Sequence, residues 1–547
     1  MFFITTNREK ADLVKEDYKQ IYKNVDVYEY FNTSVITASN SDRKPLMKFF
    51  GENAILIAGT IFDKDSFNEA LINSYKDFNV FVEELKSNVQ IFFGHYVVII
   101  MDAIRKSVEV ITDRIGLINV YYAMSEEGSY ISDDLLEVGK LTNSKLYDQA
   151  VYEFLLTEAT VGKESIFEDV WRLGFGKQLS LLNGVLKEKD IYDYRIEKLS
   201  KEEYIKRIES YFKCFNNYTG KISTDFSAGF DTRLINAIAY KTIEHFEGFN
   251  NINDHDGGCD GEISKIMADR LGIKLNCTDL NVARRCTRED YLSVLRETGA
   301  SRDAKRGQKA IVLLENKYEI CDLAIGGYGG EVIRAQYNKY AGLKGFVDNY
   351  YYGDEGVKIC KFKDYSNKVI SELKEYKVPY EVDSELLQNW YDAVSRMRIW
   401  GAGFIHLSLL YGDVVHPFMD WYLLNPLFGF KKEELYDAKL QRELINTFAP
   451  RLSDIPINAR MNTPVKKVTV KDNIKSILKS NDMVRHISCR YRNIKESFAL
   501  TDNMAEELLS DSNMDIKRIS TKCGKTVAQR MQTIISAYRY GETPLES

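Results

Sequence analysis

Residues 221–233 read KISTDFSAGFDTR and predict a strand, a tight turn and the start of a helix. Alternating apolar residues indicate a buried strand up to Phe226, and the apolar run after Arg233 indicates a buried helix. The turn between them, residues 227–232, is small and polar and contains a glycine. Backbone N–H groups and the positive end of the helix dipole would face this turn, so the segment predicts an anion site.

The side chains of the turn indicate which anion it binds. Ser227 and Thr232 supply hydroxyl donors. The carboxylate of Asp231 would repel a bare phosphate, so its presence implies a divalent cation between the two groups. The segment lacks the G-x-x-x-x-G-K-S/T pattern of the common P-loop. A strand–turn–helix unit without a ligand is the alternative interpretation.

This turn resembles the S-G-G-x-D-S pyrophosphate loop of the N-type ATP pyrophosphatases. Ala228 stands at the place of the middle Gly of that loop, and Thr232 at the place of its final Ser. In the family, the loop holds the pyrophosphate that leaves when ATP is split to AMP. The resemblance therefore implies an ATP site that includes Ser227, Ala228, Gly229, Phe230, Asp231 and Thr232.

A second turn, residues 326–334 with the sequence GGYGGEVIR, follows a predicted strand at 320–325. Its first five residues include four glycines, which would let the backbone pass close to a ligand. Asp231 and Glu331 would then lie at the ends of neighbouring strands and form a Mg²⁺ site that bridges phosphate oxygens. A glycine-rich turn without a ligand is again the alternative.

The second turn resembles the G-x-G-x-D-E segment of asparagine synthetases, with Glu331 at the final Glu and Gly330 where the Asp would be. The G-Y-G-x-D segment of the β-lactam synthetases is closer still. The resemblance implies that Gly327 lies in the ATP site and that Glu331 is catalytic. By analogy with the β-lactam synthetases, it also implies that Tyr328 deprotonates the attacking amine.

Strand and helix patterns alternate around these two turns, which predicts a parallel sheet covered on both faces, with ligands beyond the carboxyl ends of its strands. Further strands are predicted at 245–250 and 274–280, and helices at 260–271, 288–297 and 308–315. The sequence S-K-E-E from Ser200 predicts a helix start with a capping box. We therefore expect an α/β domain with a helical C-terminal part.

Three further places in this half carry candidate side chains. Asp260 and Glu262 open a predicted helix, and they either form an acidic site near the substrate or complement the helix dipole. The segment HPFMD resembles the family's P-F-x-D, which implies that Asp420 caps a helix. In the family a basic residue contacts the phosphates where PINARMNTPVKK occurs here, so Arg460 and Lys466 are both candidates. Plain solvated charge is the alternative for Lys466.

The first 195 residues predict mostly β structure, with strands at 54–61, 90–101, 107–112 and 120–123. The phrases AGTIFD, FFGHYVVIIMD, TDRIGLINVYY and FEDVWRLGFGKQLSL occur there in this order. Together they resemble the N-terminal glutaminase domain of asparagine synthetase, a class II glutamine amidotransferase. The resemblance implies an Ntn-hydrolase-like, β-rich sandwich over residues 1–195, followed by the synthetase domain over residues 200–547.

The residues that serve glutamine hydrolysis in that family are absent. The family's nucleophile is a Cys that becomes N-terminal when Met1 is removed, and here Met1 is followed by Phe2. Ala58-Gly59 stands where the family's N-G-E-I-Y segment supplies oxyanion donors. Gly94-His95 stands where the family's G-D-F segment anchors glutamine. The resemblance therefore predicts that glutamine is not the nitrogen source.

Composition sets the broad class. With 547 residues, 44% hydrophobic and 28% charged, the chain fits a soluble globular protein of two or three domains. A net charge of −6 gives no reason to expect nucleic acid binding. We expect no signal peptide and no membrane span, because no basic N-terminal region and no long apolar run occur. The eight Cys are scattered and indicate reduced thiols in the cytoplasm. A homodimer is left open.

Together these patterns predict an ATP-dependent amide ligase resembling asparagine synthetase, with ATP and Mg²⁺ bound at the two turns. The substrate would be a small-molecule or peptide carboxylate, activated as an acyl-adenylate and attacked by ammonia or a substrate amine. Cyclisation of a peptide or β-lactam precursor and amidation of a surface-polysaccharide sugar are the alternatives within this chemistry. A non-catalytic scaffold is the alternative of another class, although such a protein would be expected to lose Asp231 or Ser227.

Overall fold

The computed structural model describes most of the chain as far as residue 456. The described residues are 1–40, 44–157, 159–252, 259–279, 283–299, 304–335, 362–377 and 386–456, with short pieces at 497–499, 522–524, 530, 533–534 and 536–538. Arg460 and Lys466 lie outside these residues, so their phosphate contact stays a prediction. Within the described part, no helix combines the length and the apolar character needed to cross a membrane.

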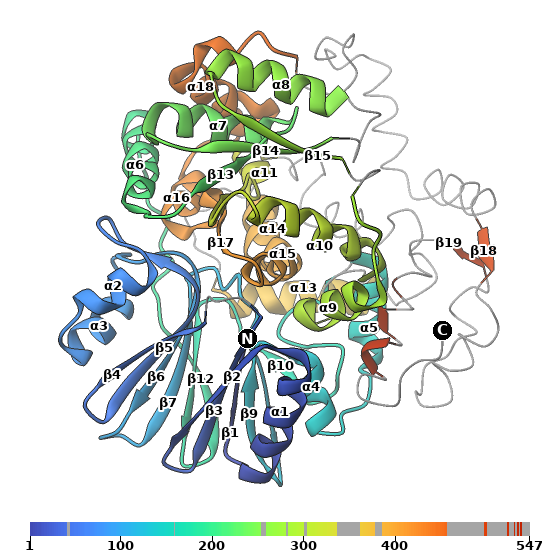
Figure 1. Ribbon diagram of the computed structural model, residues 1–547. Coiled ribbons are helices and arrows are strands. Elements are labelled where there is room, and N and C mark those ends of the chain that lie inside the picture. Colours follow the sequence, from blue (N-terminus) through green and yellow to red (C-terminus); the bar gives the residue numbers. More distant parts are fainter. Residues whose placement is uncertain are drawn as a thin grey trace.

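The N-terminal part is a sandwich of two six-stranded antiparallel sheets, with the strand orders β10-β8-β9-β1-β3-β2 and β12-β11-β7-β6-β5-β4 (Figure 1). The strands of the first sheet are β1 (Phe2–Thr5), β2 (Asn24–Tyr30), β3 (Thr33–Ser39), β8 (Tyr121–Ser125), β9 (Gly128–Ser132) and β10 (Trp171–Arg172). Those of the second are β4 (Leu46–Phe50), β5 (Asn53–Phe62), β6 (Phe93–Asp102), β7 (Ser107–Thr112), β11 (Lys177–Leu182) and β12 (Val185–Asp190). The expected β-rich sandwich is confirmed.

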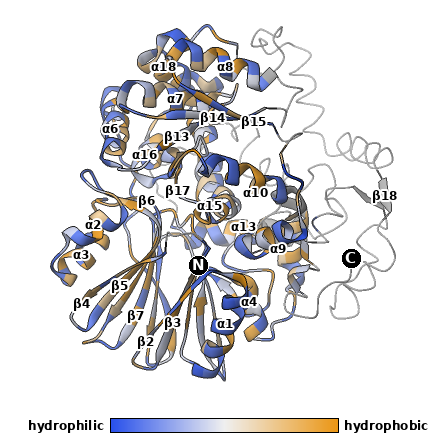
Figure 2. Ribbon diagram, in the orientation of Figure 1, coloured by the Kyte–Doolittle hydropathy of each residue, from blue (hydrophilic) through white to orange (hydrophobic). Residues whose placement is uncertain are grey.

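The structure describes five helices in the N-terminal part, and their burial differs: the first buries one face, whereas the fourth is buried on nearly all sides. They are α1 (Arg8–Ile21), α2 (Asn68–Ser74), α3 (Phe78–Leu85), α4 (Leu135–Leu141) and α5 (Asp148–Thr157). In α1, the buried residues Ala11, Val14 and Tyr18 follow the helical period. Figure 2 shows the result: outer helices such as α1 carry both hydrophilic and hydrophobic residues. The sandwich therefore has its apolar core between the sheets and beneath these helices.

The second half is built on a five-stranded parallel sheet with the order β15-β14-β13-β16-β17. Its strands are β13 (Ile222–Asp225), β14 (Glu247–Ile252), β15 (Leu275–Asp279), β16 (Leu323–Ile325) and β17 (Asp413–Val415). The helices between them are α7 (Phe230–Thr242), α8 (Cys259–Leu271), α9 (Arg288–Thr298) and α10 (Ala304–Tyr318). The predicted α/β alternation is confirmed, because the period of apolar residues changes from two to 3.6 at each strand-to-helix transition.

Local capping residues fix where two helices of this domain begin. Helix α6 (Lys201–Lys213) begins after Ser200, whose hydroxyl accepts a hydrogen bond from the Glu203 N–H while the Glu203 carboxylate accepts one from the Ser200 N–H. The predicted capping box is therefore present. Asp420 also caps α16 (Trp421–Leu424), since its carboxylate accepts the Tyr422 N–H at 3.0 Å.

The expected helical C-terminal part is confirmed. Besides α16, it contains α11 (Gly330–Ile333), α13 (Phe362–Glu375), α14 (Leu387–Asp392), α15 (Arg398–Leu409), α17 (Lys432–Leu435) and α18 (Lys439–Phe448). Helix α18 packs against α7, the helix that follows the predicted anion turn. Farther along the chain, β18 (Ser497–Ala499) and β19 (Lys522–Gly524) form a two-stranded antiparallel sheet.

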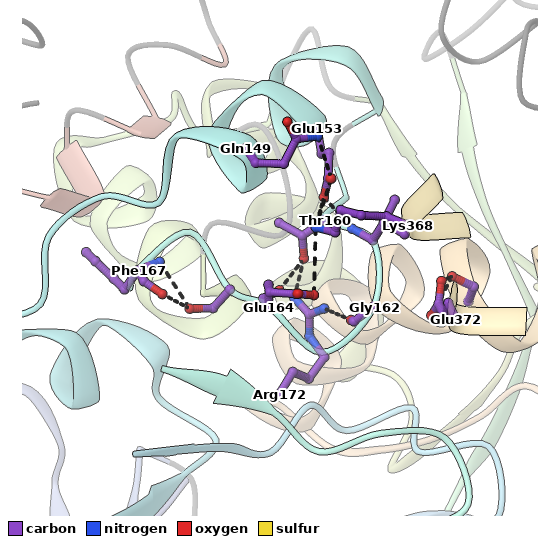
Figure 3. A network of polar contacts seen from close by, with 12 residues as sticks. Gln149, Glu153, Thr160, Gly162, Glu164, Phe167, Arg172, Lys368 and Glu372 are labelled. Carbon is purple, nitrogen blue, oxygen red and sulfur yellow. Dashed lines mark hydrogen bonds and ion pairs between the residues drawn. The ribbon is translucent and has the colours of Figure 1, made fainter. Parts of the chain in front are cut away.

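Buried polar contacts join the two halves. Asp413 accepts hydrogen bonds from Thr60 at 3.1 Å and Asn68 at 3.0 Å in the sandwich. On another side, Glu153 of α5 and Lys368 of α13 form an ion pair at 2.9 Å (Figure 3), in which the Glu153 carboxylate is fully buried. Such pairs fix the geometry of an interface because breaking one leaves a buried charge without compensation.

Candidate active site

The predicted anion turn and the first turn of α7 form one unit. The helix begins at Phe230, with Gly229 at its N-cap, so Asp231 lies in the first helical turn. The hydroxyls of Ser227 and Thr232 lie 2.6 Å apart, and the Gly229 N–H donates to the Ser227 hydroxyl at 3.3 Å. The turn is therefore preformed and internally hydrogen bonded, with the N-terminus of a 13-residue helix behind it.

The glycine-rich turn packs directly against this unit. Parallel pairing of Thr224 with Ile325 places the residues after β13 beside those after β16. A Cβ atom on Gly330 would lie 2.5 Å from the Cβ of Asp231, and one on Gly327 would lie 2.9 Å from the Thr232 nitrogen. The glycine-rich backbone therefore comes close to the segment that begins with the predicted anion turn. Larger residues in place of Gly327 or Gly330 would push the two segments apart.

Asp231 is held by two side chains from other elements. The Gln441 amide on α18 donates to Asp231 Oδ1 at 2.8 Å and also to the Gly330 carbonyl at 3.0 Å. The Arg334 guanidinium lies 3.1 Å from Asp231 Oδ2. Burial raises the pKa of Asp231, although Arg334 and Gln441 act in the opposite direction. Gln441 therefore connects the two turns through Asp231.

Glu331 lies in the electrostatic field of Asp231. Burial, with the Asp231 charge as the next cause, raises the pKa of Glu331 to about 7. Two carboxylates brought together in this way suit a divalent cation, which would relieve their repulsion. Within the described ranges, no three His, Cys, Asp or Glu side chains are arranged to hold a metal ion. Phosphate oxygens and waters would have to complete a Mg²⁺ site here, as is common for this ion.

Tyr328, predicted as the base, already has a hydrogen-bond partner. Its hydroxyl donates to the Met397 carbonyl at 2.6 Å. Its ring lies 5.9 Å from that of Trp400 and 5.7 Å from that of His416. Gly401 leaves room for this ring, since a Cβ there would lie 2.3 Å from Tyr328 Cε1. Tyr328 is part of the glycine-rich turn. Its role as a base stays a prediction, and that role would require its hydroxyl to release the hydrogen bond to the Met397 carbonyl.

Asp260 supports the anion turn. Its carboxylate accepts the Ala228 N–H at 2.7 Å and the Asn250 amide at 3.1 Å. Asn250 also donates to the Phe226 carbonyl at 2.7 Å. Asp260 therefore lies next to the predicted anion turn, and its role near a substrate stays a prediction. Glu262 is exposed.

Sequence reasoning missed three side chains at this site. Arg334 and Gln441 contact Asp231, and the buried Arg233 donates to the carbonyls of Ala228 at 3.3 Å and Pro456 at 2.7 Å. Arg233 and Arg334 each lie next to a recognised motif, so a search for cations beside the motifs would have found them. Gln441 lies 210 residues from Asp231, and nothing in the local sequence indicates this contact.

The corresponding region of the sandwich is arranged differently. Gly59 and Gly94 have φ of +102° and +98° in the paired strands β5 and β6. The Gly94 N–H donates to Asp420 at 2.8 Å, and His95 Nε2 accepts the His416 N–H at 2.9 Å. Burial lowers the pKa of His95, which favours the neutral ring. Gly94 and His95, which stand where the resembled family anchors glutamine, are therefore in contact with the second domain.

A cavity of about 1020 Å³ lies between the two halves beside these strands. Ala58 and Gly59 line one side, while Glu297, His406 and Asp413 line the other. Met1 also lines it, and its amine donates to the Ala38 carbonyl at 3.1 Å. Among the residues that the structure describes, no Cys lines this cavity.

Comparison with known proteins supports the likeness of the N-terminal part. Residues 17–192 match the family model described as a glutamine amidotransferase domain. No curated protein matches the chain. Among solved structures, glutamine phosphoribosylpyrophosphate amidotransferase from B. subtilis, complexed with ADP and GMP, is 10% identical, with a TM-score of 0.19, over 45% of this chain and 51% of that one.

The U34-tRNA thiolase NcsA from Methanococcus maripaludis, with its 4Fe-4S cluster, is 12% identical, with a TM-score of 0.20, over 50% of this chain and 87% of that one. The chain thus spans about half the length of the amidotransferase structure. Both TM-scores are far below 0.5, so these two structures support no conclusion about this chain. The family match shows that the N-terminal part is similar to glutamine amidotransferase domains.

Proposed function

We propose that this protein is an ATP-dependent ligase that forms an amide bond and releases AMP and pyrophosphate. One observation carries the proposal: the SAGFDT turn and the GGYGGE turn pack together at the carboxyl ends of β13 and β16. Ligands of open parallel sheets bind at such ends. The SAGFDT turn would supply a helix N-terminus and hydroxyls for phosphates. Asp231 and Glu331 would supply carboxylates for Mg²⁺.

The proposed reaction has two steps. A carboxylate oxygen of the substrate attacks the α-phosphorus of ATP. The bond between the α-phosphorus and the oxygen that bridges it to the β-phosphorus breaks, so pyrophosphate leaves. An amine then attacks the acyl carbon, AMP departs with the former carboxylate oxygen, and the nitrogen gives up one proton to the predicted base Tyr328 or to water. Residues 227–232 would bind the leaving pyrophosphate, and Mg²⁺ held by Asp231 and Glu331 would neutralise its charge. Such stabilisation of developing charge is usually the largest catalytic contribution.

The amine in this proposal is free ammonia or a group on the substrate. Gly94 and His95 stand where the resembled family anchors glutamine, and here they are occupied by contacts to Asp420 and His416. The glutamine amidotransferase-like domain would then serve as a structural partner of the synthetase half. This role agrees with the buried contacts of Thr60 and Asn68 with Asp413.

The test is ATP–pyrophosphate exchange against a panel of carboxylates that includes aspartate, sugar acids and short peptides. Exchange of labelled pyrophosphate into ATP that depends on one carboxylate would establish adenylation and name the substrate. Mass spectrometry with labelled ammonium then separates an intermolecular amide, which gains the label, from a ring, which does not. If no carboxylate supports exchange while the protein is folded, the proposal fails and the scaffold alternative gains.

A further inference from the structure

Arg334 lies at a position that the proposed chemistry leaves unexplained. It follows the four residues of α11 directly, and its guanidinium lies 3.1 Å from Asp231 Oδ2. About a quarter of each side chain is exposed, 25% for Arg334 and 24% for Asp231. A ligand in the turn would therefore reach both groups from the solvent side. In this pair, Asp231 is the residue proposed to hold Mg²⁺, and the Arg334 guanidinium is a cation that would compete with the metal for it.

We propose that Arg334 is an exchangeable counter-ion: it pairs with Asp231 in the free protein and binds phosphate oxygens of the nucleotide once a divalent cation occupies Asp231. The inference rests on the proposed function, because it assumes that a polyphosphate and a divalent cation bind at this turn. It adds Arg334 to the residues that touch the substrate, on an element far in the sequence from Arg460 and Lys466.

The two partners of Asp231 differ in how easily they can leave. Gln441 is fully buried and donates to both Asp231 Oδ1 and the Gly330 carbonyl, so it fixes the carboxylate against the glycine-rich turn. Gly330 leaves no space for Asp231 to move toward it, since a Cβ there would already lie 2.5 Å from the Asp231 Cβ. The long side chain of Arg334 is partly exposed, so it is the partner that can move.

The chemistry of the guanidinium matches its second partner. Arginine presents a planar fork of N–H donors that fits phosphate oxygens as well as carboxylate oxygens. A divalent cation is the stronger partner of a carboxylate, because the Coulomb attraction grows with charge. Once a divalent ion is bound, Arg334 and the ion would repel each other across Asp231. The pyrophosphate, with its several negative oxygens, offers the guanidinium a nearby alternative.

The test uses Arg334→Gln and measures binding directly, without turnover. Mn²⁺ binding to the free protein is followed by electron paramagnetic resonance, and pyrophosphate binding in the presence of Mg²⁺ by calorimetry. Removal of the competing cation should tighten Mn²⁺ binding about two- to fivefold, the range for a partly exposed ion pair. Loss of the phosphate contact should weaken pyrophosphate binding about tenfold or more. Arg334→Lys keeps the charge but loses the fork, so it should recover only part of the pyrophosphate affinity.

Arg442→Gln is the matched control. The Arg442 guanidinium lies 4.6 Å from the centre of the Phe230 ring, so this variant removes an equal charge beside the same turn without touching Asp231. Circular dichroism and thermal unfolding establish that each variant is folded. The inference is overturned if Arg334→Gln leaves Mn²⁺ affinity unchanged or weaker, or if both variants weaken pyrophosphate binding equally. A wild-type protein that binds neither Mn²⁺ nor pyrophosphate would overturn the proposed function as well.

Discussion

Two regions of this molecule use glycine to bring backbones together beside polar groups, and they differ in where those polar groups are directed. In the sandwich, Gly59 and Gly94 let β5 and β6 approach closely, and a Cβ on Gly59 would lie 2.3 Å from the His95 carbonyl. The neighbouring polar groups are buried: His95 is fully buried and accepts the His416 N–H. They contact the other domain and have no access to solvent.

In the parallel sheet, the glycine-rich turn brings Asp231 next to Arg334 and Gln441, and both members of the Asp231–Arg334 pair stay partly exposed. A ligand can compete for groups of this kind, whereas groups that hold an interface can be removed only at the cost of the interface. Under the proposed function, the sandwich region would support structure and the parallel-sheet region would support chemistry. Substitutions in the two regions should therefore affect different measurements.

The largest effect is expected for Asp231→Asn. The variant keeps the size of the side chain and its contact with Gln441 but removes the charge that would bind Mg²⁺. Pyrophosphate exchange should fall by about 10²–10³, as for loss of one electrostatic catalytic group. Thermal unfolding should change little, and Asp437→Asn on the exposed surface is the control. Exchange at the wild-type rate would remove the metal role from Asp231.

Glu331→Gln should act on the metal alone. If Glu331 shares Mg²⁺ with Asp231, the Mg²⁺ concentration for half-maximal exchange should rise roughly ten- to a hundredfold, the range for losing a partner in a metal site. A titration of exchange rate against Mg²⁺ measures this shift. If the Mg²⁺ midpoint is unchanged, Glu331 does not bind the metal, and the glycine-rich turn is better explained as a turn that binds no ligand.

The same substitution, Gly→Ala, should affect the exchange rate in one region and the free energy of unfolding in the other. Gly330→Ala would push Asp231 out of place and lower exchange by about tenfold to a hundredfold, because catalytic groups tolerate little displacement. Gly59→Ala would instead lower the free energy of unfolding by about 1–3 kcal/mol through overpacking. Urea unfolding and exchange rates, measured on both variants, separate these outcomes. If Gly59→Ala lowers exchange in the folded protein as strongly as Gly330→Ala, the proposed division between the regions is wrong.

The interface should also show a pH dependence through Asp420. Burial raises the pKa of Asp420 from 3.8 to about 6, although it accepts hydrogen bonds from the Gly94 and Tyr422 N–H groups. Because the folded-state pKa lies above the unfolded-state value, the stabilisation is complete below 3.8 and is lost as the pH rises to about 6. Asp420→Asn should remove this loss, which amounts to about 3 kcal/mol at most.

Urea unfolding of wild type and Asp420→Asn at several pH values between 4 and 7 measures the difference. Asp454→Asn is the control, because Arg270 lowers the pKa of that exposed carboxyl, so any contribution has the opposite sign. A stability difference between wild type and Asp420→Asn that is independent of pH would show that Asp420 titrates normally in the folded protein.

The smallest effect concerns glutamine, for which we expect none. Incubation with isotopically labelled glutamine should release no glutamate beyond the rate without protein, because no Cys is among the described residues that line the cavity next to Met1. Ammonium, or a substrate amine, should support AMP formation in the same assay. Glutamate release coupled to AMP formation would contradict the structural role assigned to the sandwich.

Much of the fold could be predicted because its signals are local. The strand at 107–112 was predicted to the residue, and α8 begins one residue before its predicted start. The Ser200 capping box and the Asp420 cap depend on residues within three positions of each other. Apolar periodicity and caps act within one or two turns of chain, so a single sequence carries them.

The partners of the candidate site depend on packing. The sequence determined that a turn beginning at Ser227 leads into a helix and that a glycine-rich turn follows β16. The turn is shorter than the predicted 227–232, because the helix already begins at Phe230, so Asp231 lies in its first turn. Only the tertiary structure decided that Gln441 holds Asp231 from 210 residues away and that His95 contacts His416 across 321 residues. Such contacts depend on how the sheets and helices pack, since a buried donor binds whichever acceptor the assembled core places within reach, and no local pattern encodes that partner.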